Sequence, residues 1–360
     1  MHLKFETKEL DNILSKISKI IPSASYVRFV GSNKKVRVMT SHDGFNVSVE
    51  LPCQLMQEGK FAVVFDDVKK LFRNRKEIEM KLSDKGNKVM FKAGSSKDFS
   101  GDIVTQETHS IKFHSSENIS LTEEQAEFIC SSVPLLALED VYFKKPLSIT
   151  VYFSDKGGYC FVRSDFHVGV SRVKGEFKKA MLTMPLKNFT GITSLAEDGK
   201  FSIAVNENSI YATGSTFDIS FPLEAQEDSN AKKIFKIVES VVSTDEVAII
   251  DMQELKQSMD NVVALNDGKA SMAVSISKKD GISLSLSALR GSVKAALKNA
   301  KVKKDVSSFD VSPQMLSNIL KNAKKGEFSM RTNERLFSLS SNFKIKAGKV
   351  SYHYVGTFFE

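Results

Sequence analysis

The side chains most able to bind a metal ion or act as nucleophiles are six histidines and three cysteines. They are His2, His42, His109, His114, His167, His353, Cys53, Cys130 and Cys160. The chain contains no His-Glu-x-x-His, Cys-x-x-Cys, Gly-x-Ser-x-Gly or Gly-x-x-x-x-Gly-Lys motif that would give these residue types a catalytic context. The sequence therefore predicts no metal site, no cofactor and no catalytic residue, and the chain is predicted not to be an enzyme.

Two pairs of adjacent carboxylates, Asp66-Asp67 and Glu123-Glu124, are the remaining candidates for acid–base chemistry. Neighbouring residues point apart on a helix, so the two members of a pair do not converge on one substrate. Both pairs fall where a helix is predicted to begin, and the helix dipole stabilises negative charge there. We interpret them as first-turn residues.

Composition indicates a globular protein with a polyanionic partner. Of 360 residues, 41% are apolar and 26% are charged, which argues against disorder. No apolar run approaches the roughly 18 residues of a membrane helix, and no signal peptide is evident at the start. Three scattered cysteines fit a reducing compartment, so we expect a cytoplasmic protein without a membrane partner. The net charge of +8 favours a polyanion.

Six predicted helices can position that charge, because each carries apolar residues at helical spacing along one side. They cover residues 8–21, 66–73, 122–133, 186–192, 251–263 and 313–320. The opposite side is basic on five of them and acidic on the third. The basic residues predicted to face the polyanion are Lys8, Lys16, Lys19, Lys69, Lys70, Arg73, Arg75, Lys187, Lys256, Lys321, Lys324 and Lys325. The alternative interpretation is an ordinary solvated surface.

Each helix belongs to a repeated unit in which a short alternating strand enters the helix and further strands follow. Alternating runs divided by Asn, Asp and Gly turns are typical of antiparallel hairpins. Six such units in three pairs indicate three similar domains, at residues 1–117, 118–242 and 243–360. A linker is predicted to start within residues 227–233. Amide side chains of Asn12, Asn188, Asn318 and Asn322 would add weak contacts to the basic faces.

The chain resembles the sliding clamps of replicative DNA polymerases, and the bacterial beta type in particular. Length, three tandem domains and the doubled unit within each domain carry the resemblance over nearly the whole chain. Local signatures are Lys4-Phe5-Glu6-Thr7-Lys8-Glu9-Leu10 and residues 163–170, where bacterial clamps tend to read Thr-Asp-Gly-His-Arg-Leu. The resemblance implies an α+β DNA clamp fold, with two helices packed on antiparallel sheets in each domain, that forms a ring.

The resemblance also implies partners. Two chains would close head to tail as a homodimer around duplex DNA and hold it without reading its sequence. The ring would tether a replicative polymerase and would need a clamp loader, in the cytoplasm or nucleoid of a bacterium, possibly an infected one. The alternative is a monomeric, open processivity factor held on DNA by its basic charge.

In beta clamps a partner peptide binds between the middle and last domains. The matching positions here are Ser164, Phe166, His167, Val168, Gly169, Val355, Gly356, Thr357 and Phe358. Phe166 stands where the family usually has glycine, and the tail lacks the usual Met-Pro-Met run. We therefore expect a divergent polymerase, perhaps viral, with its own peptide motif. The alternative is that Phe166 and His167 fill local core.

Head-to-tail closure would pair an edge strand of the first domain with one of the last, which would cover both exposed edges. The candidate interface residues are Phe99 and Ile103 on one side and Val263 and Leu265 on the other. Each of the four could instead be an ordinary core residue.

Overall fold

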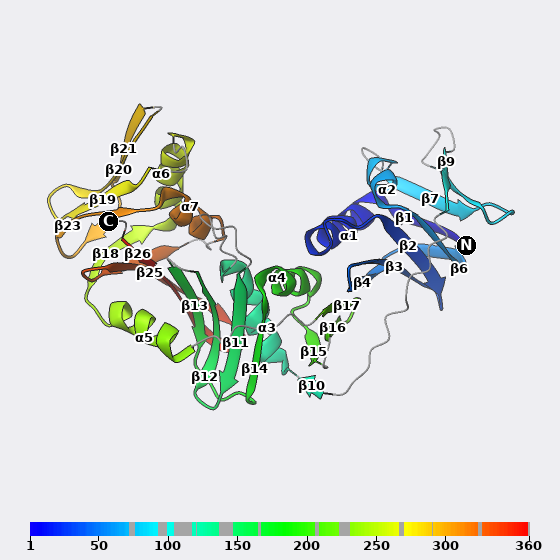
Figure 1. The fold of residues 1–360 in the computed structure, drawn as a ribbon, viewed down its shortest axis with the longest axis horizontal. Coiled ribbons are helices and arrows are strands. Elements are labelled where there is room, and N and C mark those ends of the chain that lie inside the picture. Colours follow the sequence, from blue (N-terminus) through cyan, green and yellow to red (C-terminus); the bar gives the residue numbers. More distant parts are fainter. Residues whose placement is uncertain are drawn as a thin grey trace. The chain divides into compact units, whose positions relative to one another are not determined.

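The computed structural model describes residues 1–71, 76–92, 99–103, 117–119, 121–136, 147–164, 167–205, 209–222, 231–265, 270–289, 291–322 and 326–358. Over these residues the chain forms seven α-helices and four antiparallel sheets (Figure 1). It divides into two compact units, Met1–Glu123 with Gly191–Ala225 and Glu124–Thr190 with Gln226–Glu360. The predicted α+β class is confirmed.

The first unit contains a five-stranded and an eight-stranded sheet. The five-stranded sheet has the order β5-β1-β7-β8-β9, formed by Gln54–Gln57, His2–Glu6, Glu77–Leu82, Lys88–Lys92 and Phe99–Asp102. The eight-stranded sheet has the order β10-β15-β16-β17-β4-β3-β2-β6, formed by Glu117–Ile119, Phe201–Val205, Ser209–Gly214, Phe217–Pro222, Phe45–Leu51, Lys35–His42, Tyr26–Ser32 and Gly59–Val64. Alternation of buried and more exposed residues, as in β1, gives each sheet one apolar face for the helices.

Helices α1 (Thr7–Ile20) and α2 (Phe65–Leu71) belong to the first unit. In α1, Leu10, Leu14 and Ile17 are fully buried, so the helix turns its apolar stripe to the core and its polar side to solvent. Helix α4 (Leu186–Leu195) approaches α1 closely at Gly191. A Cβ atom at Gly191 would lie 2.7 Å from Cγ1 of Ile20, which explains a glycine inside this helix.

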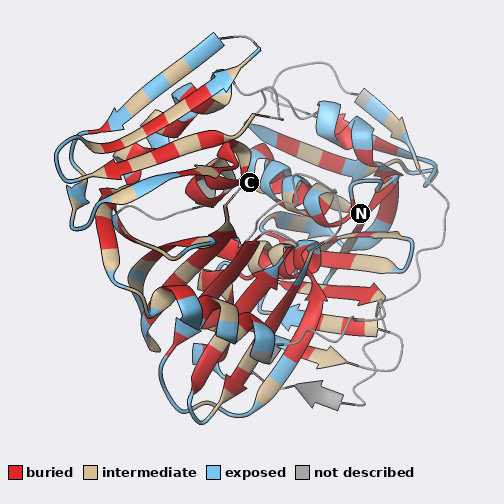
Figure 2. Ribbon diagram, turned by 60° about the vertical axis from the view of Figure 1, so that its left-hand side comes forward, coloured by how far each residue is buried: buried red, intermediate tan, exposed pale blue. Residues whose placement is uncertain are grey.

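The second unit contains a nine-stranded and a four-stranded sheet, whose central strands are largely buried (Figure 2). The nine-stranded sheet has the order β14-β11-β12-β13-β26-β25-β24-β18-β22, formed by Ala180–Pro185, Ser148–Ser154, Gly157–Arg163, His167–Val173, Gly348–Thr357, Leu336–Ile345, Glu327–Thr332, Glu246–Asp251 and Lys301–Val302. The four-stranded sheet has the order β21-β20-β19-β23, formed by Gly291–Leu297, Gly281–Ala288, Met272–Ser277 and Val306–Val311.

The remaining helices are α3 (Glu123–Ser132) with the 3₁₀ turn η1 (Val133–Leu136), α5 (Ala231–Val242), α6 (Met252–Leu265) and α7 (Pro313–Asn322). The Asp251 carboxylate caps α6 by accepting hydrogen bonds from the backbone N–H groups of Gln253 and Glu254, at 2.9 and 2.8 Å. Ser312 caps α7 through Met315 N–H, at 3.3 Å, as its position before Pro313 predicts.

All six helices predicted from the sequence are present, at α1, α2, α3, α4, α6 and α7. Helix α5 was not predicted, because residues 227–233 were interpreted as the start of a linker, whereas the chain is helical from Ala231. The signal that could have found it is the apolar spacing of Ile234, Val238 and Val241, which are all buried.

Two sheets cross the predicted domain boundaries. Strand β17 pairs with β4, and β13 pairs with β26, so strands of the predicted middle domain continue sheets begun by the first and the last. The division at residues 117 and 242 remains a prediction.

Candidate nucleic-acid and partner interfaces

The solvent side of α1 carries a polar stripe. Lys8, Asn12, Ser15 and Lys19 are exposed and are spaced four, three and four residues apart, opposite the buried apolar stripe. Residues at this spacing share one helix face. The two lysines of that stripe are exposed, and their contact with a polyanion stays a prediction.

Lys16, on the flank of the same helix, is already paired. Its ammonium group forms a short ion pair with the carboxylate of Glu197, and its side chain is only 16% exposed. The hydrogen bond and charge of Lys16, helped by a hydrogen bond from Asn12, hold the pKa of Glu197 below its usual value. Glu197 therefore offsets one of the predicted DNA-contacting charges, a partner that the sequence analysis missed.

Helix α2 adds charge beside α1. The Lys69 ammonium donates a hydrogen bond to Ser18 Oγ, at 3.2 Å, and lies 5.8 Å from the ring centroid of Phe65. Lys70 is exposed. Lys69 and Ser18 are 51 positions apart in sequence, and their hydrogen bond brings the lysines of α1 and α2 onto neighbouring surfaces of the first unit. Arg73 and Arg75 lie outside the described residues.

The other predicted polyanion contacts are distributed differently. Lys187 on α4 and Lys256 on α6 are exposed. Asn188 is 2% exposed, so the expectation that its amide contacts a partner is wrong: it faces the core side of α4. Lys321 belongs to α7, but its side chain, like those of Asn318 and Asn322, is outside the described structure, as are Lys324 and Lys325.

Six of the predicted partner-peptide residues lie on two adjacent strands, β13 and β26, while Ser164 precedes β13 and Phe358 follows β26. His167 is opposite Gly356, Val168 is opposite Val355, and Gly169 is opposite Tyr354. Opposed residues share a sheet face and successive residues alternate, so these positions divide between the two faces of the sheet. Thr357 and Phe358 are partly exposed, while Phe166 lies outside the described residues.

One of those faces is covered by α5. Ile234, Val238 and Val241 of the helix form one buried cluster with Val168, Val170, Phe161 and Val355 of the sheet. Figure 1 shows α5 lying along this sheet beside β12 and β13. Part of the predicted peptide surface is therefore occupied by a helix of the same chain.

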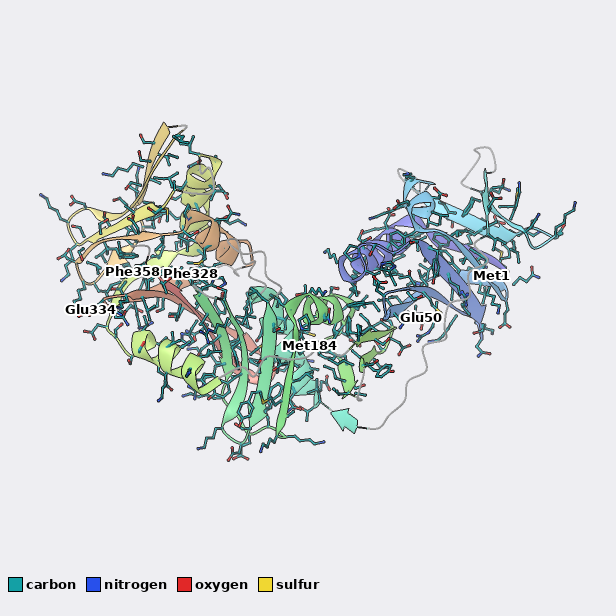
Figure 3. All side chains as sticks on the ribbon, in the orientation of Figure 1. Met1, Glu50, Met184, Phe328, Glu334 and Phe358 are labelled. Atoms are coloured by element: carbon teal, nitrogen blue, oxygen red, sulfur yellow. The ribbon has the colours of Figure 1, made fainter. Side chains whose placement is uncertain are left out.

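The other face is filled by rings. His167 stacks on Tyr354 with centroids 5.8 Å apart, and Ser164 Oγ lies 2.7 Å from His167 Nδ1. Phe358, labelled in Figure 3, packs on Phe309 at 4.5 Å. A Cβ atom at Gly356 would meet the ring of Phe337 at 2.7 Å, so this position accepts no larger residue without rearrangement.

The predicted dimer residues lie at or next to open sheet edges. Strand β9, which contains Phe99 and is followed by Ile103, is the last strand of the five-stranded sheet. Val263 and Leu265 are half-buried at the end of α6, which packs against β21, the outer strand of the four-stranded sheet. The sequence analysis did not single out β21 itself.

The cysteine thiols lie in environments that disfavour the reactive thiolate form. Burial raises the pKa of the Cys160 thiol, and burial with the charge of Glu50 raises that of Cys53 to about 11. In the part of the chain that the structure describes, no cluster of three or more His, Cys, Asp or Glu side chains has a metal-binding arrangement. No described helix is long and apolar enough to cross a membrane.

No protein-family model matches the sequence, and no curated protein has significant sequence similarity to it. Solved structures do resemble the fold over the full chain. The DNA polymerase III beta subunit of Thermotoga maritima has 14% sequence identity and a TM-score of 0.71, with 100% of this chain and 99% of that chain covered.

Two further structures have a TM-score of 0.74, again with 100% of this chain and 99% of theirs covered. They are the beta subunit of Borrelia burgdorferi in complex with a natural product, at 11% identity, and the sliding clamp of Bartonella birtlesii bound to griselimycin, at 13% identity. Identities this low establish the fold alone. The chain therefore has the fold of the bacterial sliding clamps, the beta subunits of DNA polymerase III.

Proposed function

We propose that this chain is a sliding clamp, a non-catalytic ring that encircles duplex DNA and tethers a replicative polymerase. The observation that carries the proposal is the clamp fold over the whole length of the chain, with coverage of 100%. A likeness confined to one domain would be compatible with many functions. Agreement over all four sheets, in one chain order, supports the clamp role.

Contact with DNA is assigned to the basic helix faces. Lys8 and Lys19 on α1 and Lys69 and Lys70 on α2 offer positive charge without a base-reading element. Contacts to phosphate carry no sequence information and exchange readily in water, so they allow a protein to move along the duplex. Lys187 and Lys256, both exposed helix residues in the second unit, are further proposed contacts.

Ring closure is assigned to the two open edges. Strand β9 of one copy would pair with β21 of another, which would satisfy the unpaired backbone groups of both strands. Since the two edges are different surfaces, the contact is head to tail, and two copies close the ring. Phe99, Ile103, Val263 and Leu265 would flank this pairing.

We also propose that the polymerase binds through a peptide, but α5 restricts which of the predicted peptide residues that peptide can reach. A polymerase peptide that uses Val168 and Val355 would have to displace α5, whereas one that uses the end of the chain would meet Thr357 and Phe358. Loading a closed ring onto DNA without ends would require a loader, and the proposed setting is the cytoplasm.

The test is topological retention without a loader. Linear duplex is fixed to a bead at one end, the protein threads over the free end, and that end is then blocked by a bound protein. Washing in about 1 M salt removes electrostatic binding, since the Debye length is then only about 3 Å. We expect retention on blocked DNA, and release when a restriction enzyme cuts the duplex.

Loss of the protein at high salt from blocked and unblocked DNA alike would contradict the ring. Salt-sensitive binding by a monomer would instead support the open processivity factor. Lys69→Ala with Lys70→Ala should weaken binding at low salt but leave high-salt retention intact, because topology does not depend on charge.

A further inference from the structure

A row of large side chains crosses the α5-bearing face of the nine-stranded sheet at one level. Met181, Tyr152, Tyr159 and Arg172 lie directly opposite one another on β14, β11, β12 and β13. Directly opposed residues share a face. Phe161 and Val170, two residues further along the same face, are covered by α5, so this row lies next to the helix and is left partly open.

The row forms an aromatic surface, which we call the tyrosine platform (Tyr152, Tyr159, Phe235 and Met181). The Tyr152 and Tyr159 rings have centroids 6.4 Å apart. Phe235 of α5 meets Tyr159 edge-on at 4.9 Å, and the Arg172 guanidinium lies 5.2 Å from the Tyr159 centroid. Met181 is 52% exposed. Apolar area of this kind, open on a sheet, is suited to contact with a partner.

Positive charge borders the platform on the side away from α5. Arg172 is opposite Ser351, and Ser351 is opposite Asn342. Two residues beyond these positions stand Lys349 and Lys344, which are exposed and on the same face by strand alternation. Lys174, also exposed, directly follows the end of β13. The hairpin that carries Lys344 and Lys349 also approaches Lys174, because a Cβ atom at Gly348 would lie 3.8 Å from the Lys174 carbonyl oxygen.

Repulsion among these cations disfavours the folded state. Lys344 and Lys349 are directly opposed across β25 and β26, and like charges in that arrangement repel. Among the described residues, no ion pair joins Arg172, Lys174, Lys344 or Lys349 to a carboxylate, although Asp155 and Glu176 are exposed on nearby turns. A bound polyanion would relieve this repulsion.

We propose that the tyrosine platform and its four flanking cations bind single-stranded nucleic acid. Unpaired bases have free faces that stack on aromatic rings, and their backbone phosphates pair with Arg and Lys beside those rings. Duplex DNA offers the phosphates but keeps its base faces stacked. The site is separate from the lysines of α1 and α2, so this inference goes beyond the proposed function and does not depend on ring formation.

The first test measures fluorescence anisotropy of labelled dT20 and U20 with the full-length protein. Tyr152→Ala should weaken binding about tenfold, because one base–aromatic stack is lost, whereas Tyr152→Phe keeps the ring and the affinity. Equal affinity for dT20 and U20 would show that the site accepts single-stranded DNA and RNA alike. Tighter binding of one would identify that nucleic acid as the natural ligand. Tyr211→Ala, on another sheet, is the matched control.

The charge component is measured through salt. Lys344→Ala with Lys349→Ala should lower the slope of log K against log salt by about 1.4, at about 0.7 per phosphate contact for single strands. Lys69→Ala with Lys70→Ala should weaken duplex binding much more than dT20 binding, whereas Tyr152→Ala should do the reverse. That contrast separates a failure of this site from a failure of the proposed clamp function.

A crosslinking experiment on the unaltered protein tests the site without depending on whether the variants fold. A dT20 strand that carries 5-iododeoxyuridine should crosslink at Tyr152 or Tyr159 on irradiation, as located by mass spectrometry. The proposal is overturned if crosslinks map elsewhere, or if an abasic 20-mer binds as tightly as dT20. It is also overturned if polyglutamate displaces dT20 at equal charge, which would indicate a surface for acidic peptides.

Discussion

The carboxylate of Glu197 reduces the positive charge that α1 can present to DNA. It forms an ion pair with Lys16 from a position 181 residues away, and it also interacts with Asn12. An ion pair whose carboxylate is this exposed contributes little to stability, roughly 0 to 1 kcal/mol. Its larger consequence is for binding, because the pair removes Lys16 from the set that is free to contact phosphate.

Glu197→Gln should therefore strengthen binding to duplex DNA. We expect a gain of about two- to fivefold at low salt and a salt slope that is steeper by up to about 0.9, equivalent to one added phosphate contact. Anisotropy titration over a range of salt concentrations measures both. Glu334→Gln makes the same charge change in the second unit, and an equal gain in that variant would show that only net charge matters.

His353 is a partly buried histidine whose pKa is lowered. Burial, followed by the charges of Arg331 and Arg172, lowers its pKa to about 4. The unfolded chain takes up this proton near pH 6.5 and the folded chain only near pH 4, so stability is lost as the pH falls through that window. The contribution is up to about 3 kcal/mol.

The corresponding prediction concerns the slope of stability with pH. Urea unfolding of the parent protein between pH 7 and pH 4 should show a larger loss of unfolding free energy than His353→Asn, whatever the absolute stability of the variant. Parallel slopes would mean that His353 is protonated in the folded state. His42→Asn, at the end of β3 in the first unit, is the control.

At the scale of elements, α5 is held by apolar contacts along one side. Ile234, Val238 and Val241 are buried against the nine-stranded sheet, while Glu239 and Ser240 are exposed. Burial of this stripe stabilises a helix of 12 residues that would be marginal in isolation. Because the stripe also covers Val168 and Val355, the stability of α5 controls access to that face.

Ile234→Ala should test this coupling. A loss of about 2 to 4 kcal/mol is expected for truncating a buried isoleucine, measured by urea unfolding. Hydrogen exchange should also quicken in α5 and in the covered parts of β13 and β26. Ser240→Ala on the exposed side should change neither, and unchanged exchange in β13 after Ile234→Ala would show that α5 does not shield the sheet.

At the scale of the whole molecule, the open edges β9 and β21 predict association. Light scattering across a dilution series should give a mass near 80 kDa, twice the 40.0 kDa of the chain. Leu265→Asp would place a charge at the proposed interface and should shift the mass toward 40.0 kDa, whereas Ala264→Asp, on the exposed side of α6, should not. A monomer at all concentrations would favour the open form.

The local pattern of the sequence determined the elements and the fold class. The apolar spacing of Leu10, Leu14 and Ile17, and the cap at Ser312-Pro313, are properties of neighbouring residues, so α1 and α7 could be predicted without tertiary information. The order of those elements was sufficient to indicate the clamp fold. Helix α5 could also have been predicted from the spacing of its apolar residues. It was missed because the polar residues 227–233 were interpreted as the start of a linker.

Tertiary structure alone decided which distant residues meet. The pairing of Lys16 with Glu197, the register of β13 on β26, and the opposition of Tyr152, Tyr159 and Arg172 join positions far apart or on separate strands. A strand shifted by one residue would send every side chain to the other face, and local sequence does not fix that register. The candidate lysines could therefore be named from the sequence, but their partners and the face of the predicted peptide residues could not.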